Sequence, residues 1–200
     1  CVPARFFRAF ASWLPEPETI ACLSYDYSDF ASSATGPAAR SKRTLSEWSL
    51  IDQPAAREEM RNRFPGVPLW VIGHSLGTMT IPLQTGTTDI SRIITVASNL
   101  PFTDDYPILP KQLISLFWYG HIPALVRTFG YLPGWASGFG VDLPGPAYWE
   151  WRKWCTNPQS IYPEFGKSLP MPTPLPPDTR IDMFGFSDDW MVCKTGLYRL

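Results

Sequence analysis

One short stretch of the sequence has residue types and spacing suited to nucleophilic catalysis. It is the pentapeptide Gly73-His74-Ser75-Leu76-Gly77, which matches the pattern G-x-S-x-G. In this pattern the serine stands on a sharp turn between a strand and a helix, with its hydroxyl raised above the end of the sheet. We expect glycine to be required at both ends because side chains there would collide across the turn. Ser75 is therefore the candidate nucleophile.

The flanking sequence favours this interpretation. The apolar residues 68–73 predict a buried strand that runs directly into the pentapeptide, and residues 76–83 predict a helix that leaves it. The free N–H groups at the start of such a helix would point toward the site. We therefore expect the Leu76 N–H to stabilise the oxyanion that forms when an ester or amide carbonyl is attacked.

A later segment offers the acid that would orient a catalytic base. Residues 180–185 predict another strand, and Asp188 and Asp189 follow it. A carboxylate at the carboxyl end of such a strand is well placed for this role. Asp188 is the first candidate and Asp189 the second, although a solvated turn would also explain both residues.

The general base is the difficulty, because the sequence has only two histidines, His74 and His121. Hydrolases with this kind of elbow have the order serine, acid, histidine, and no histidine follows Asp189. We expect His74 to pack beside the nucleophile and His121 to pack or to contact substrate. A serine without a base is a weak nucleophile, so a non-catalytic pseudoenzyme or binding module on the same fold stays a second hypothesis.

The remaining patterns predict the framework that positions these residues. Short apolar stretches alternate with helical ones, which predicts an α/β fold with a mostly parallel sheet and helices on both faces. The expected helices are residues 6–14, 54–64 and 76–83, and the expected strands are residues 19–25, 68–73, 92–97 and 180–185. Cys22, in the first of these apolar runs, is expected to be buried.

A long segment separates the last two strands. Residues 99–179 exceed an ordinary connection, and residues 113–126 within them are expected to be helical. We interpret residues 1–98 as the first part of the core with the elbow, 99–179 as a helical cap or lid, and 180–200 as the core strand and acid loop. The aromatic residues of the cap could form an apolar substrate pocket or simply the cap's own core; they are Phe117, Trp118, Tyr119, Tyr131, Trp135, Trp149, Trp151 and Trp154.

Composition excludes several other classes of function. With 200 residues and a formal net charge of −1, the chain suits one domain and lacks the basic excess of a nucleic-acid-binding protein. The longest apolar stretch, residues 113–126, is too short to span a membrane. Four dispersed cysteines and two histidines make a metal site unexpected, and no cofactor is expected. The cysteine usage favours a cytoplasmic location; the oligomeric state is left open.

The elbow, the strand before it and the later Gly185-x-x-Asp188 together resemble the α/β-hydrolase superfamily. More narrowly, the chain resembles a group of predicted α/β hydrolases close to the serine aminopeptidase (proline iminopeptidase-like) branch. This narrower resemblance rests on residues 129–134, 138–146 and 151–155, and it extends over nearly the whole chain. It implies hydrolysis of an ester or amide with an apolar group through an acyl-enzyme, and it does not distinguish esterase, peptidase and thioesterase.

The sequence also departs from the family pattern. In the family, the second oxyanion N–H comes before the position of Pro3, and the last strand and the catalytic histidine come after the position of Leu200. We therefore expect the sequence to be an internal fragment of a longer hydrolase, impaired in activity and prone to aggregate through unpaired sheet edges.

Two smaller departures lie within the chain. After Asp26 and Tyr27, Ser28-Asp29 replaces the Arg-Gly of the family, so we expect an altered turn there. Thr78 follows the elbow where many family members have glycine.

Overall fold

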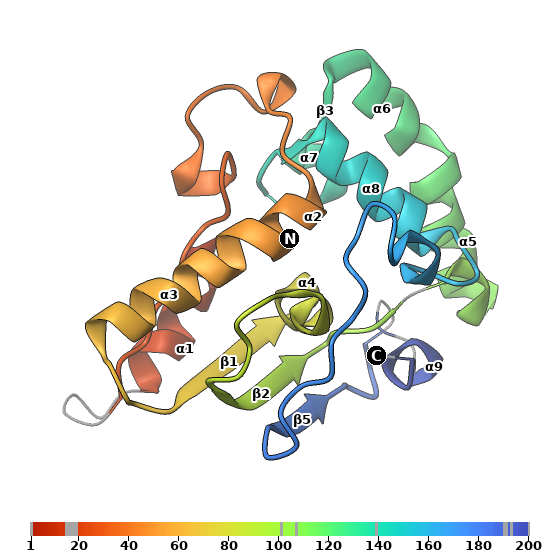
Figure 1. The fold of residues 1–200 in the computed structure, drawn as a ribbon. Coiled ribbons are helices and arrows are strands. Elements are labelled where there is room, and N and C mark those ends of the chain that lie inside the picture. The colour runs from red at the N-terminus through yellow and green to blue at the C-terminus, as the bar shows by residue number, and fades with distance from the viewer. Residues whose placement is uncertain are drawn as a thin grey trace.

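A parallel three-stranded sheet carries the elbow, and helices pack around it (Figure 1). The computed structural model describes residues 2–14, 20–100, 102–106, 108–138, 140–189, 192 and 194–199. The strands are β1 (Leu69–His74), β2 (Ile90–Val96), β3 (Tyr131–Leu132), β4 (Leu143–Pro144) and β5 (Arg180–Phe184). The α-helices are α1 (Arg8–Trp13), α2 (Leu45–Glu47), α3 (Gln53–Arg63), α4 (Leu76–Met79), α5 (Ile108–Tyr119), α6 (His121–Phe129), α7 (Gly134–Ser137), α8 (Gly145–Cys155) and α9 (Lys194–Leu197).

The order of the strands in the main sheet is β1-β2-β5, and both pairs are parallel. The strands predicted at residues 68–73, 92–97 and 180–185 are therefore confirmed. Because the strands are parallel, their carboxyl ends lie at one edge of the sheet. The elbow after β1, the residues after β2 and the acid loop after β5 are thus brought to the same edge.

The strand predicted at residues 19–25 is wrong. Residues 20–25 join no sheet, and Ile20, Leu23 and Tyr25 are exposed. Cys22 is exposed rather than buried. This segment lies against the end of α3, where Cys22, Arg63 and Phe64 help to line a hollow of about 260 Å³. An apolar run alone does not form a strand, because a strand also needs a neighbour with which to share hydrogen bonds.

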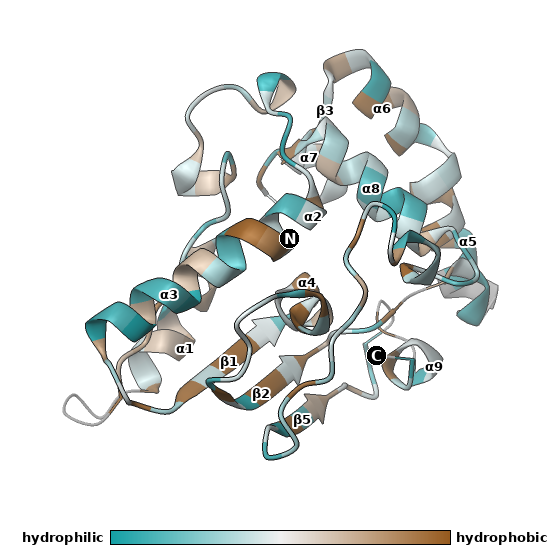
Figure 2. Ribbon diagram, in the orientation of Figure 1, coloured by the Kyte–Doolittle hydropathy of each residue, from teal (hydrophilic) through white to brown (hydrophobic). Residues whose placement is uncertain are grey.

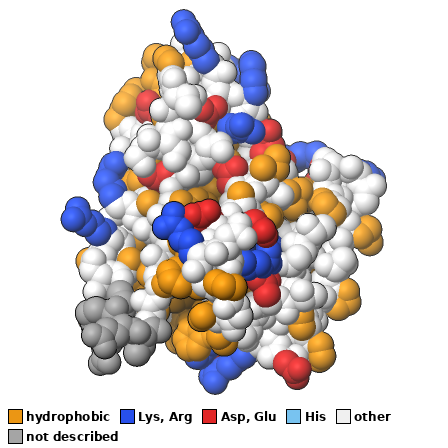
Figure 3. All heavy atoms as spheres, turned by 60° about the vertical axis from the view of Figure 1, so that its left-hand side comes forward, with side chains coloured by type: hydrophobic (Ala, Val, Ile, Leu, Met, Phe, Trp, Pro, Cys, Tyr) orange, Lys and Arg blue, Asp and Glu red, His pale blue; other side chains and the backbone are white. Residues whose placement is uncertain are grey.

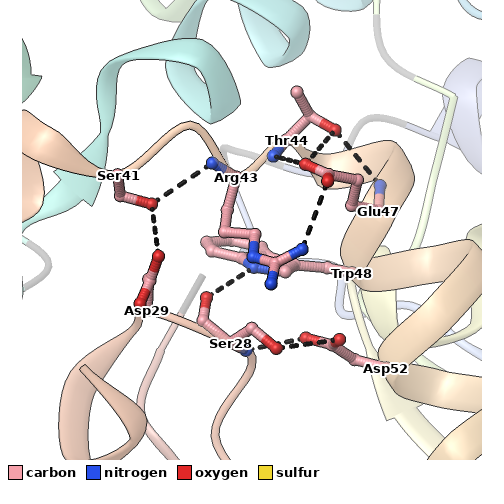
Figure 4. Close-up of polar contacts among 8 residues, drawn as sticks. All are labelled: Ser28, Asp29, Ser41, Arg43, Thr44, Glu47, Trp48 and Asp52. Atoms are coloured by element: carbon pink, nitrogen blue, oxygen red, sulfur yellow. Dashed lines mark hydrogen bonds and ion pairs between the residues drawn. The ribbon is translucent and has the colours of Figure 1, made fainter. Parts of the chain in front are cut away.

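The helix that leads to β1 begins earlier than predicted. Thr44 and Glu47 form a capping box in which each side chain bonds the other's backbone N–H (Figure 4). From there α2 continues through a π-helical segment, Trp48–Asp52, into α3. The spacing Thr-x-x-Glu is a known start of a helix, so the sequence did carry this information.

The largest core cluster surrounds this helical segment rather than the sheet. Trp48 is fully buried, its indole Nε1 donates to the Ser28 carbonyl at 2.9 Å, and its ring stacks on Tyr27 with centroids 5.0 Å apart. The altered turn at Ser28 is fixed by the Asp52 carboxylate, which accepts from the Ser28 backbone N–H at 2.7 Å (Figure 4). The same cluster continues without interruption into Tyr148 and Trp154 of α8.

The aromatic residues of segment 99–179 mostly pack on one another. The Trp118 ring meets the edge of Trp151 at 4.9 Å and of Phe117 at 4.7 Å. Tyr119 and Trp135 are exposed. Core packing therefore accounts for most of this set. The helix expected at residues 113–126 is present as α5 and α6, which are separated at Gly120.

The sheet is covered unevenly. On one face, Ile93 of β2 packs with Ile81 and Ile90 in a second, smaller core cluster. On the other face, Trp70 is 53% exposed and Ile72 is also exposed, with the Arg92 guanidinium 4.7 Å from the centroid of the Trp70 ring. The strands are largely hydrophobic along their length (Figure 2). The expected cover on both faces is thus incomplete within the described residues.

Apolar side chains also reach the surface elsewhere. The space-filling view shows them among charged ones over the lower part of one side of the molecule (Figure 3). On α1, Phe10 and Trp13 are exposed, although the helix itself forms as predicted. Within the described residues, no helix combines the length and apolar character that crossing a bilayer requires.

The position of Trp48 generates a prediction about stability. We expect Trp48→Ala to lower the free energy of unfolding by about 3–5 kcal/mol, because it leaves a cavity in the main core and removes the stack on Tyr27. Urea unfolding followed by circular dichroism measures this. The matched control is Trp135→Ala, at a site 74% exposed, which should change stability by about 0.5 kcal/mol or less. Equal effects of the two variants would contradict the assignment of the core.

Candidate active site

Ser75 occupies a backbone conformation that few non-glycine residues adopt. Its φ is +54° and its ψ is −118°, between the last residue of β1 and the first of α4. This ψ lies outside the left-handed helical region, so the conformation costs of order 1–3 kcal/mol and persists only where its surroundings hold it. The strand–turn–helix context predicted for the pentapeptide is therefore present, with the strain at the serine itself.

The turn requires glycine at one end but not at the other. A Cβ at Gly73 would lie 2.5 Å from the backbone carbon of Gly77 and 2.5 Å from Cγ2 of Thr78. A Cβ at Gly77 would meet nothing within 4 Å. The steric prediction is therefore confirmed at Gly73 and wrong at Gly77, because it is the helix backbone and Thr78 that approach the strand.

Hydrogen bonds hold the strained residue on both sides. The Ser75 N–H donates to the Val96 carbonyl at 3.1 Å, which extends the pairing of β1 with β2 into the turn. The Ser98 hydroxyl donates to the Ser75 carbonyl at 2.8 Å and lies 3.0 Å from the Thr78 hydroxyl. Ser98 is fully buried, and the positive φ of Ala97 (+48°) turns the chain toward it after β2.

No sequence motif identifies these supporting residues. Ser98 follows a strand end, which places it at the edge of the sheet near the elbow, and that position was the available indication. Gln53 supports the turn from a second direction: its Nε2 donates to the Leu76 carbonyl at 3.4 Å and to the Tyr27 hydroxyl at 2.9 Å. Burial raises the pKa of Tyr27, so its hydroxyl remains protonated.

Leu76, whose N–H is the expected oxyanion donor, lies at the start of α4. Leu76 is the first residue of α4, so its N–H has no acceptor within the helix. The helix is shorter than predicted, because α4 ends at Met79 and a 3-10 turn, Ile81–Leu83, follows. Its macrodipole therefore contributes little, and the direct hydrogen bond from the Leu76 N–H is the main contribution it could make.

The acid loop reaches the edge of the sheet that carries the elbow. Asp189 is half-buried and its Oδ1 accepts from the Val192 N–H at 3.1 Å, whereas Asp188 is exposed. Desolvation lowers the pKa of His74, and the negative charge of Asp189 opposes this lowering. The structure therefore places Asp189, the second candidate, in electrostatic range of the elbow.

Neither histidine is placed as a base for Ser75. The hydrogen bonds among the described residues join neither His74 nor His121 to the Ser75 hydroxyl. The His74 ring lies 6.3 Å from the ring of Phe7, which is a packing contact with the N-terminal helical segment. His121 begins α6, in the segment interpreted as the cap, and is exposed. Among the described residues, the candidate nucleophile Ser75 therefore has no histidine bonded to its hydroxyl.

Neither the groove along α5 nor a metal site offers a stronger candidate than the turn at Ser75. A shallow groove of about 710 Å³ lies along α5, lined by Lys111, Leu116 and Tyr119 among others, and includes no elbow residue. Within the part of the chain that the structure describes, no three His, Cys, Asp or Glu side chains gather as a metal site would require.

Comparisons with protein-family models, with curated proteins and with solved structures give no match. Evidence about function therefore comes from the geometry and chemistry of the site.

The two glycines of the elbow provide a matched pair of substitutions. We expect Gly73→Ala to lower the free energy of unfolding by about 1–3 kcal/mol, because its Cβ would overlap the helix backbone. Gly77→Ala adds the same methyl group in open space inside a helix, so stability should stay the same or rise by up to about 1 kcal/mol. Urea denaturation of the two variants tests this. If Gly77→Ala proved the more damaging, the described turn would be incorrect.

The strain at Ser75 predicts an unusual order of stabilities. We expect Ser75→Gly to be about 1 kcal/mol more stable than Ser75→Ala, because glycine adopts φ +54° without the steric cost that any Cβ carries. Thermal and urea unfolding of the two variants provide the comparison. An alanine variant as stable as the glycine variant would show that the turn is unstrained.

Proposed function

We propose that this protein is a serine hydrolase of the α/β-hydrolase type, with Ser75 as the nucleophile. The single observation that carries the proposal is the backbone of Ser75, φ +54° and ψ −118°, on a turn between a parallel strand and a helix. A serine that only filled a turn would not need this conformation, and glycine would fit it better.

The chemistry follows from the positions of the atoms. The Ser75 hydroxyl would attack the carbonyl carbon of an ester or amide, and the Leu76 N–H would donate to the oxyanion that forms. Collapse of this intermediate releases the alcohol or amine, which takes up the proton that Ser75 loses, and leaves an acyl group on Ser75. Water then hydrolyses the acyl-enzyme to a carboxylic acid and restores the Ser75 hydroxyl. Asp188 or Asp189 would supply the carboxylate that orients the base; the influence of Asp189 on the pKa of His74 supports Asp189.

The proposed substrate carries an apolar group. Its support is the resemblance to predicted α/β hydrolases carried by residues 129–134, 138–146 and 151–155, together with the exposed aromatic residues of segment 99–179, Trp135 foremost. Because most of the aromatic set is used in packing, these few exposed side chains are the ones available to an acyl or leaving group.

A second candidate function has an observation of its own. No hydrogen bond among the described residues links Ser75 to either histidine, and without a base the hydroxyl is a weak nucleophile. A non-catalytic protein that binds an ester or amide at the elbow is the function that this observation favours. The two candidates differ in whether Ser75 forms a covalent bond.

Labelling with a fluorophosphonate probe distinguishes these two functions. We expect the folded protein to be modified at Ser75, as located by mass spectrometry of its peptides, and Ser75→Ala to lose the label by at least about 100-fold. Ser187→Ala, a serine substitution in the acid loop, is the matched control and should label like the unmodified chain. Labelling that persists in Ser75→Ala would refute the assignment. A folded protein that takes no label would support the binding function instead.

A further inference from the structure

One face of α3 holds the chain that follows the candidate nucleophile. Three side chains of this helix are spaced four residues apart and therefore leave it on the same side: Gln53, Arg57 and Arg61. Their hydrogen bonds reach successive points of the chain after Ser75, namely the Leu76 carbonyl, the Thr85 carbonyl and the Asp89 carboxylate. The elbow helix α4 is thus fixed to α3 at its start and again after its end.

The hydrogen bonds between these side chains run in one direction. Arg57 donates to Oε1 of Gln84, and Nε2 of Gln84 donates to Oε1 of Gln53 at 2.5 Å. Nε2 of Gln53 then donates to the Leu76 carbonyl at 3.4 Å. A guanidinium only donates and a carbonyl only accepts, so this chain of bonds fixes which way both amides face. The amide nitrogen of Gln53 is therefore held toward α4.

All three members of this chain of bonds are buried. Gln53 is 5% exposed, Gln84 3% and Arg57 6%. Among the described residues, no carboxylate forms an ion pair with Arg57, and its Nε has no hydrogen-bond partner. An apolar side chain would be buried there at a lower cost in free energy. What the guanidinium orients therefore explains its presence better than stability does.

Two hydrogen bonds hold the peptide units on either side of the Leu76 Cα. The Leu76 N–H shares a planar, trans peptide unit with the Ser75 carbonyl, to which the Ser98 hydroxyl donates at 2.8 Å. Within such a unit the N–H points to the opposite side from the carbonyl. Gln53 holds the next peptide unit through the Leu76 carbonyl. With both units held, the direction of the Leu76 N–H is set before a substrate binds.

From these contacts, we propose that Gln53, oriented by Gln84 and Arg57, is a positioning residue for the oxyanion N–H of Leu76. This proposal rests on the function proposed for Ser75. A helix of four residues makes few hydrogen bonds of its own, so the direction of α4 depends on contacts such as this one. The position of the donor matters because a shift of about 1 Å in a reacting geometry can lower a rate by about 100-fold.

The rate of fluorophosphonate labelling at Ser75 tests the proposal. Gln53→Met keeps the length of the side chain and removes its hydrogen bonds. We expect it to lower the maximal labelling rate by about 10–100-fold with little change in the affinity for the probe. Arg61→Gln is the matched control, because Arg61 lies on the same face of α3 and bonds Asp89 instead of the elbow helix. Its labelling rate should be unaltered, and circular dichroism establishes that each variant is folded.

Gln53→Glu provides a readout that a packing role would not produce. An ionised carboxylate only accepts hydrogen bonds, whereas a protonated carboxyl group can donate to the Leu76 carbonyl. Burial raises the pKa of a carboxyl group, so labelling relative to the unmodified protein should recover as the pH falls from about 8 to about 5. Tyr27, which is bonded to Gln53, stays protonated because burial raises its pKa. Gln53→Met cannot titrate and should stay slow throughout.

Three results would overturn the proposal. They are labelling of Gln53→Met at the full rate, a relative rate of Gln53→Glu that does not change with pH, and an Arg61→Gln variant as slow as Gln53→Met. Failure of the function proposed for Ser75 gives a different result, because the unmodified protein then takes no label. The amide resonances of Gly77 in NMR decide the positioning role in that case, since its nitrogen belongs to the peptide unit that Gln53 holds. Gln53→Met should shift them, and unchanged resonances would refute the role.

Discussion

The backbone at Ser75 is the constraint on which the surrounding structure depends. Its φ of +54° is stable only because β2 supplies an acceptor for its N–H and Ser98 supplies a donor for its carbonyl. The close approach of the helix to the strand then requires glycine at position 73. Each of these contacts comes from a different segment, so the turn cannot relax without displacing several elements.

The parallel sheet explains why distant residues meet at this turn. β1, β2 and β5 all end at one edge, so the elbow, Ser98 and the acid loop are brought together although more than a hundred residues separate the first from the last. The position of the candidate site is therefore a consequence of the strand order.

Sequence reasoning predicted those parts that local pattern determines. The three strands and the elbow were found because short apolar runs and the G-x-S-x-G spacing are local features. The strand at residues 19–25 failed because pairing depends on a neighbour that the pattern does not identify. Ser98 was missed because its contact with Ser75 crosses between strands. Sequence pattern does not distinguish Asp188 from Asp189, since adjacent residues in a loop differ mainly in the direction of their side chains.

Positive φ alone does not identify a functional serine, because Asp29, Ala31, Ala97 and Ser160 share it. Ser75 differs in combining a ψ of −118° with a position at a strand end and before a helix N-terminus. Glycine at position 75 would relieve the strain, because it adopts a positive φ without steric cost. A sequence that retains a hydroxyl there keeps a stability cost of order 1–3 kcal/mol. The cost of the strain therefore falls on the residue that carries the hydroxyl, which favours the role proposed for Ser75 over that of a residue that only fills a turn.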